Sequence, residues 1–212
     1  MNIFLYVLEM IGTVAFAVSG AMIAIRKRLD IVGVIFLGVI TAVGGGALRD
    51  LMIGVTPPMC FQNPVYLVTA CVTSFLFFLP FVRRPLVRHQ RQFDLLLLIM
   101  DSLGLAVFTV SGIQACIHAH PAASPILLVF VGVLTATGGG VVRDALAGIT
   151  PMVFVKHVYA TASLAGAVLY TGLNAAGVDT RLAGSVAAVV VFAIRCLAAH
   201  YHWNMPRAQE EV

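Results

Sequence analysis

Seven apolar stretches divide this sequence and restrict what the chain can fold into. They cover residues 3–25, 31–55, 64–82, 93–113, 125–149, 157–173 and 182–199. A helix of about 20 apolar residues crosses the hydrocarbon core of a bilayer, where every backbone polar group needs a partner within the protein. With 60% hydrophobic residues, 10% charged residues and a mean hydropathy of +1.01, the chain is too apolar for a soluble domain. We therefore predict an all-α integral membrane protein with seven transmembrane helices.

Basic residues between these stretches predict the orientation of the chain. Alternate loops carry most of them, namely Arg26, Lys27, Arg28, Arg83, Arg84, Arg88, Arg91, Lys156, Arg195 and Arg207. Of the opposite loops only the sixth has a basic residue, Arg181. Because cytoplasmic loops of membrane proteins are enriched in Lys and Arg, we expect the N-terminus outside and the tail 200–212 in the cytoplasm. The first stretch lacks a basic leader, so we expect a retained helix and no targeting peptide.

The chain contains an internal repeat with an offset of 92 to 94 residues. TAVGGGALRDLMIGVTP at 41–57 matches TATGGGVVRDALAGITP at 135–151 in 10 of 17 positions, and FAVSG at 16–20 matches FTVSG at 108–112. We assign 1–82 and 93–174 to two three-helix repeats, 83–92 to a basic cytoplasmic linker and 182–199 to a seventh helix. An odd number of spans inverts the second copy relative to the first. Inverted repeats are typical of channels and transporters whose path runs between the halves.

Each repeat carries a glycine triplet within an apolar stretch, formed by Gly44, Gly45 and Gly46 and by Gly138, Gly139 and Gly140. Glycine lowers helix propensity by about 1 kcal/mol per residue relative to alanine. One interpretation is therefore a kinked or unwound helix whose free carbonyls line a pore and replace part of a cation's hydration shell. The other interpretation is close helix packing, since residues without side chains let two backbones approach.

Charged and hydroxyl side chains within the apolar stretches are the other candidate site residues. They are Arg49, Asp50, Arg143, Asp144, Glu9, Asp101, Ser19 and Ser111. Charges within a bilayer are costly unless they are paired or face water, although an arginine near a span's end can also anchor at the interface.

Adjacent residues project to different sides of a helix, so we expect no pairing within either Arg-Asp dipeptide. Arg49 and Arg143 are instead plausible counter-charges for Glu9 and Asp101, as structural ion pairs or as part of a conduction path. For the two serines, a bond to the preceding helical turn is favoured over a place in the path.

The residue types that are common in catalytic and metal sites do not form a recognisable site in this sequence. Cys60, Cys71, Cys116 and Cys196 lack metal-ligand or disulfide spacing, and the pairs His118/His120 and His200/His202 lack a third ligand. We find no nucleophile with a base, no phosphate-binding loop and no basic-aromatic surface for nucleic acid. We expect no enzymatic activity, no cofactor, no metal and no nucleic-acid partner.

The segments TAVGGGALRD and TATGGGVVRD, with seven spans and two inverted repeats, resemble the bacterial branch of the trimeric intracellular cation (TRIC) channel family. The resemblance implies a homotrimer in the lipid of the bacterial inner membrane. Each subunit would hold an hourglass-shaped pore, lined mainly by spans one, two, four and five, that passes potassium and other monovalent cations. The glycine triplets would bend the pore helices. Animal members bind a phosphoinositide through a basic stretch on the fifth helix, where this chain has only Arg143.

The same bacterial sequences are also catalogued as a putative glycine transporter family. A secondary transporter of glycine or another small amino acid is therefore the alternative function. Inverted repeats suit a carrier as well as a channel. A non-conducting membrane scaffold, assembled through small-residue faces, is a third possibility.

Overall fold

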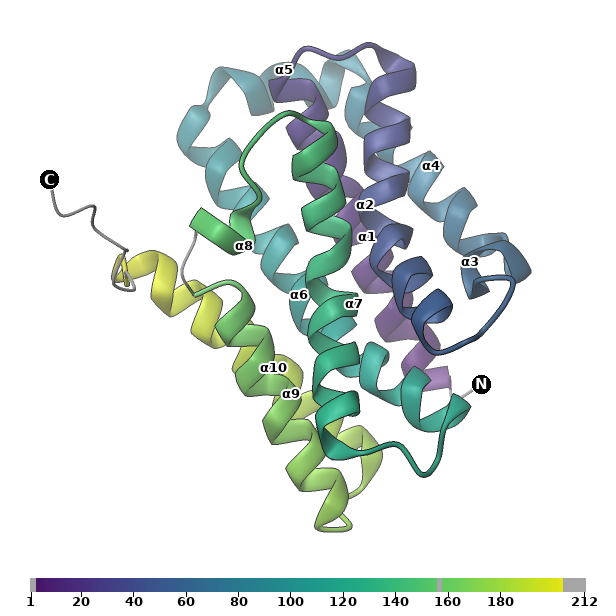
Figure 1. Cartoon of the computed structure of the whole chain (residues 1–212). Helices are drawn as coiled ribbons and strands as arrows, with labels where there is room; N and C mark the ends of the chain where they lie inside the picture. The colour runs from purple at the N-terminus through teal and green to yellow at the C-terminus, as the bar shows by residue number, and fades with distance from the viewer. Residues whose placement is uncertain (1–2, 156–157, 204–212) are drawn as a thin grey trace, which may run out of the picture.

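The computed structural model describes residues 3–155 and 158–203, and over these residues the chain is helical with short connections (Figure 1). The helices are α1 (Ile3–Arg26), α2 (Ile31–Met52), α3 (Met59–Gln62), α4 (Val65–Phe78), α5 (Pro80–Arg88), α6 (Gln90–Ala119), α7 (Pro125–Leu146), α8 (Met152–Val155), α9 (Ala160–Ala175) and α10 (Thr180–His200). The predicted all-α class is therefore confirmed.

Five of these helices, α1, α2, α6, α7 and α10, are long and apolar enough to cross a membrane. Helices α4 and α9 coincide with the third and sixth predicted spans but have only 14 and 16 residues. The third span divides at Leu79, which has extended backbone dihedrals. Pro80 explains this break, because a proline disfavours helical geometry in the residue before it. His157, the predicted start of the sixth span, lies outside the described residues, as does Lys156.

The linker 83–92 has a different local structure from the loop that its basic residues suggested. Residues up to Arg88 belong to α5, and α6 already begins at Gln90. The described part of the chain therefore passes from one half to the other through two helices separated by His89. Most of the predicted tail, residues 204–212, lies outside the described residues.

The two halves of the chain have the same internal packing. Helices α1, α2 and α4 contact one another, and so do α6, α7 and α9. Contacts of α2 with α7 and of α1 with α6 join the halves, and α10 packs on α6 and α9. Figure 1 shows α1 and α6 running in opposite directions, as α2 and α7 do. Each repeated segment thus contains three helices that contact one another.

Both glycine triplets lie within uninterrupted helices, so the prediction of unwound or broken helices is wrong. Helix α2 continues through Gly46 to Met52, and α7 through Gly140 to Leu146. A Cβ atom on Gly45 would collide with the carbonyl oxygen of Thr135, and one on Gly139 would collide with that of Thr41. The middle glycines therefore allow α2 and α7 to cross in backbone contact. This close approach offsets the low helix propensity of glycine.

The glycines of the FxVSG segments place α1 against α2 and α6 against α7. A side chain at Gly20 would collide with Thr41, and one at Gly112 with Thr135. Each threonine hydroxyl donates a hydrogen bond within its own helix, to Leu37 at 2.6 Å and to Val131 at 2.7 Å. The serines beside Gly20 and Gly112 are consequently carried to the centre of the bundle.

Candidate functional site

The two Arg-Asp pairs lie buried near the ends of α2 and α7. In each pair the arginine Nε donates to the neighbouring carboxylate, over 2.9 Å from Arg49 to Asp50 and 2.7 Å from Arg143 to Asp144. The prediction that these neighbours do not pair is therefore wrong. All four residues are buried, which excludes anchoring at the membrane interface.

The last glycine of each triplet lies beside the arginine that turns towards its neighbouring aspartate. A Cβ atom on Gly46 would lie 3.6 Å from Nη2 of Arg49, and one on Gly140 would lie 3.7 Å from Nη2 of Arg143. Each arginine thus bends back over a glycine one turn earlier in its helix. A Cβ atom would stay at ordinary van der Waals distance from either guanidinium, and on Gly140 its tightest contact would be the Tyr159 hydroxyl at 3.0 Å.

Each aspartate also holds the chain that follows its helix. The second oxygen of Asp50 accepts a hydrogen bond from the Met59 amide at 2.8 Å, and that of Asp144 accepts one from Met152 at 2.9 Å. These amides begin the short helices α3 and α8. Sequence analysis did not assign this bond, although the aspartate and the following Thr-Pro are repeated in both copies.

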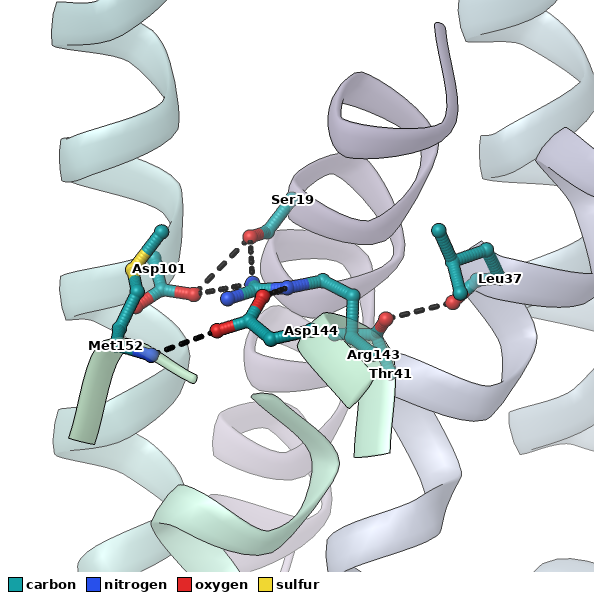
Figure 2. A network of polar contacts seen from close by, with 7 residues as sticks. All are labelled: Ser19, Leu37, Thr41, Asp101, Arg143, Asp144 and Met152. Atoms are coloured by element: carbon teal, nitrogen blue, oxygen red, sulfur yellow. Dashed lines mark hydrogen bonds and ion pairs between the residues drawn. The ribbon is translucent and has the colours of Figure 1, made fainter. Parts of the chain in front are cut away.

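In the second half, the charged residues form a buried network that joins three helices (Figure 2), and within it Oδ2 of Asp101 and Nη2 of Arg143 have no partner in the described chain. Nη1 of Arg143 donates to Oδ1 of Asp101 at 2.6 Å and to the hydroxyl of Ser19. That hydroxyl donates to the same Asp101 oxygen at 3.1 Å. Arg143 is fully buried and Asp101 is 1% exposed. The predicted Arg143–Asp101 pair is confirmed, whereas Ser19 bonds across helices rather than to its own preceding turn.

The equivalent residues of the first half are arranged differently. Glu9 accepts a hydrogen bond from the hydroxyl of Tyr66 at 2.5 Å. Among the described residues, Arg49 forms an ion pair with Asp50 and none with Glu9, so the predicted Arg49–Glu9 pair is not formed. Ser111, the counterpart of Ser19, has a buried hydroxyl without a hydrogen-bond partner in the described chain. The same holds for the side-chain amide of Gln114.

A cavity of about 480 Å³ lies against this first-half cluster. Its polar lining includes Glu9, Arg49, Asp50, Tyr66, Ser111 and Gln114. The lining continues to His118 and Ala119, both of which are exposed. The carboxylates of Glu9 and Asp50 and the guanidinium of Arg49 line the cavity, so these three groups in their ionised forms have a net charge of −1. The two halves therefore carry equivalent residues in two states, one lining a cavity and one sealed by ion pairs.

Of the glycines in the two triplets, only Gly46 lines this cavity. The middle glycines are buried at the crossing of α2 and α7. The triplets thus act by letting α2 and α7 pack closely. This packing brings the Arg49–Asp50 and Arg143–Asp144 pairs near the same helix crossing.

Arg195 was assigned to the end of the last span, but the structure places it inside α10. It is 3% exposed, and its Cζ lies 4.8 Å from the centre of the Tyr159 ring. Nε and Nη2 of Arg195, like the Tyr159 hydroxyl, have no hydrogen-bond partner within the described chain. Helix α10 is outside the repeat, so the first half has no such arginine. The signal in the sequence was an arginine with apolar residues on both sides.

The histidines do not assemble into a metal site. Within residues 3–155 and 158–203, no group of three or more His, Cys, Asp or Glu side chains could hold an ion. His120 instead forms a 2.8 Å hydrogen bond with the carbonyl oxygen of Ile53, which links the end of α6 to the end of α2 beside the cavity.

Comparisons with known proteins agree with this architecture. A family model described as "Glycine transporter" matches residues 6–81 and 98–175, which are the two halves. The UPF0126 inner membrane protein YadS of Escherichia coli K12 is 37% identical over 203 residues, covering 95% of this chain and 94% of YadS. The UPF0126 membrane protein YvgT of Bacillus subtilis is 36% identical, with 94% of each chain covered.

Two of the solved structures that share this fold are prokaryotic TRIC channels. The TRIC orthologue from Rhodobacter sphaeroides is 33% identical, with a TM-score of 0.85 and coverage of 94% of this chain and 98% of the orthologue. A prokaryotic TRIC channel crystallised in 0.5 M KCl is 31% identical, with a TM-score of 0.87 and coverage of 97% and 100%. The duplicated helices, the family model and these structures lead to one conclusion: the chain belongs to the bacterial branch of the TRIC family, which is also described as a glycine transporter family.

Proposed function

We propose that this protein is a passive channel for monovalent cations, including potassium, with a pore inside each subunit. The observation that carries the proposal is the cavity with Glu9, Ser111 and Gln114 in its lining. Its net negative charge favours cations, and side-chain oxygens without partners can replace part of the hydration shell of an ion. The cation-channel function of the TRIC relatives supports the same assignment.

The sealed cluster of the second half is the gate in this proposal. Arg143 places a buried positive charge between α1, α6 and α7. The buried network of Arg143, Asp101 and Ser19 fills the space between these helices, so the path stays closed until Arg143 separates from Asp101 and Ser19. The gate opens when the second half adopts the arrangement of the first, in which the arginine is paired with its neighbouring aspartate alone.

In the proposed topology, seven helices span the bacterial inner membrane with α4 and α9 as its short spans, and the two repeats are inverted. The N-terminus is outside, so the cavity near the start of α1 faces outwards and the sealed cluster faces the cytoplasm. The protein assembles as a homotrimer, as the trimeric TRIC orthologue does. The name of the relative YadS as an inner membrane protein supports the location.

Potassium flux through the purified protein in vesicles, together with single-channel recording in planar bilayers, tests the proposal. We expect cation-selective unitary currents. Glu9→Gln should reduce the selectivity for potassium over chloride, because it removes the net negative charge of the cavity. Asp94→Asn is the matched control, since Asp94 is exposed and paired with Arg26. The absence of unitary currents in symmetric potassium would contradict the proposal.

A carrier for glycine or another small amino acid is the second candidate. Arg49 and Glu9 both line the cavity without pairing with each other, so they could bind a carboxylate and an ammonium group. The description of the matching family model points to the same substrate. Uptake of labelled glycine into the same vesicles separates the two functions. Saturable uptake of glycine without unitary currents would support a carrier. Uptake that does not saturate would contradict the carrier function.

A further inference from the structure

Four arginines converge on one hollow at the end of the bundle opposite the cavity. Arg28, Arg83, Arg84 and Arg88 line a space of about 490 Å³ together with Ile25 and Leu29. They come from two separate segments, the turn between α1 and α2 and the helix α5, which lie at the same end of the molecule (Figure 1). A run of basic residues along one loop would not by itself produce this convergence.

The positive charge of the hollow is not neutralised by the described part of the protein. No acidic residue lines the hollow. The two nearby aspartates have other partners: Asp94 pairs with Arg26 at 3.1 Å, and Asp30 accepts a hydrogen bond from the Gly33 amide at 2.8 Å. Among the described residues, none of the four arginines forms an ion pair. Their mutual repulsion therefore favours binding of an anion.

We propose that this hollow binds a phosphate-bearing anion, and that its source is the headgroup of an anionic phospholipid. A guanidinium donates two parallel hydrogen bonds to phosphate, so several guanidinium groups around one space suit a phosphate better than a single-point anion. The site lies on the α1–α2 turn and α5, away from α7, the helix that carries Arg143.

The apolar surroundings of the hollow favour a lipid over free phosphate. Ile25 and Leu29 form part of its wall. On α5, Phe81 is 72% exposed, and Arg83 lies over the ring of Phe78 with 4.9 Å between its Cζ and the ring centre. A short helix with arginines and exposed apolar residues is suited to the membrane interface. A phospholipid supplies a phosphate for the arginines and acyl chains for these apolar groups, whereas a phosphate ion leaves the latter exposed.

The test measures binding of dioleoylphosphatidylglycerol to the purified full-length protein by native mass spectrometry, with dioleoylphosphatidylcholine as the neutral lipid. The variant Arg84→Gln/Arg88→Gln changes two exposed side chains, so we expect it to keep the fold. We expect its affinity for phosphatidylglycerol to fall at least about tenfold, because each basic residue near an anionic surface strengthens binding. Arg181→Gln, an exposed arginine at the start of α10, is the matched control and should keep the wild-type affinity.

A second arm adds inorganic phosphate to the lipid-free protein and follows thermal unfolding. Stabilisation by phosphatidylglycerol but not by millimolar phosphate supports the lipid headgroup. Equal stabilisation by phosphate alone overturns the assignment to lipid, and equal phosphatidylglycerol affinity of the double variant and Arg181→Gln overturns the site. Because both arms measure binding, their outcome is independent of whether the protein conducts ions.

Discussion

At the scale of single residues, the three glycines of each triplet have different neighbours and therefore different roles. The first glycine, Gly44, would place a Cβ atom 3.8 Å from the Cα of Gly139, an ordinary contact. The middle glycine, Gly45, touches the backbone of the opposite helix, and the last, Gly46, lies under the guanidinium of Arg49. Of the three, only the middle position depends on the absence of a side chain, because a Cβ atom at Gly44 or Gly46 would make ordinary van der Waals contacts.

Gly45→Ala should destabilise the protein by about 1–3 kcal/mol, the usual range for overpacking a tight interior. The added methyl group collides with the carbonyl oxygen of Thr135, so α2 and α7 must move apart. Gly44→Ala should leave stability unchanged or raise it, because alanine has the higher helix propensity. Unfolding of both variants in detergent checks the difference. Equal stabilities would mean that the backbone contact is not as close as described.

Asp101→Asn should destabilise the protein by about 3 kcal/mol or more, because it leaves the buried Arg143 with a single carboxylate partner. Asp94→Asn removes an exposed carboxylate that also pairs with an arginine, and should cost about 1 kcal/mol or less. Chemical denaturation of the two variants gives the comparison. The gate proposal also predicts faster potassium flux through Asp101→Asn, and flux equal to wild type would contradict it.

At the scale of helices, α10 makes the two halves unequal. It packs against α6 and α9, and it places Arg195 over Tyr159 in the second half only. In the first half the equivalent tyrosine, Tyr66, bonds to Glu9, whereas the hydroxyl of Tyr159 has no partner within the described chain. Helix α10 therefore packs against the half that contains the buried Arg143 network. The half whose charged residues line the cavity has no equivalent helix.

Replacing each buried arginine by methionine should separate the roles of α10 and α7. Arg143→Met leaves the carboxylates of Asp101 and Asp144 without their main cation and should cost about 3–5 kcal/mol. Arg195→Met should change stability by less than about 1 kcal/mol, because the loss of the contact with Tyr159 is offset by no longer burying unpaired donors. Thermal unfolding of the two variants is the measurement. A loss in Arg195→Met as large as that in Arg143→Met would contradict this difference between the two arginines.

At the scale of the whole molecule, the proposed function depends on two ends with different access to water. The cavity reaches exposed residues at the end of α6, while the Arg143 network is buried between α1, α6 and α7. The basic hollow lies at the end opposite the cavity. Orientation in the membrane is therefore testable from either side with a reagent that enters only the cavity.

Cys60 lines the cavity and provides this test. In a variant that keeps Cys60 as its only cysteine, a membrane-impermeant thiosulfonate added outside should modify the thiol and reduce potassium flux, slowly because the side chain is buried and burial raises the pKa of the thiol. The same reagent added from the cytoplasmic side should have no effect, because the sealed cluster lies between. Cys60→Ser is the control that should abolish the effect of the reagent. Modification from the cytoplasmic side alone would reverse the proposed topology.

Apolar length and repeat spacing are properties of the residue order, so the helical character and the duplication could be predicted from the sequence. The Arg143–Asp101 pair was one of two equivalent pairings expected, and the other, Arg49–Glu9, does not form. The tertiary structure was needed to show that α2 and α7 stay helical through their glycines, that each arginine pairs with its neighbour, and that Arg195 is buried. The continuous course of α2 and α7 and the burial of Arg195 depend on contacts between segments far apart in the chain, such as Gly45 with Thr135. Such contacts offset local propensity, and they place two segments that are identical in 10 of 17 positions in different surroundings, one beside a cavity and one in a buried ion-pair network.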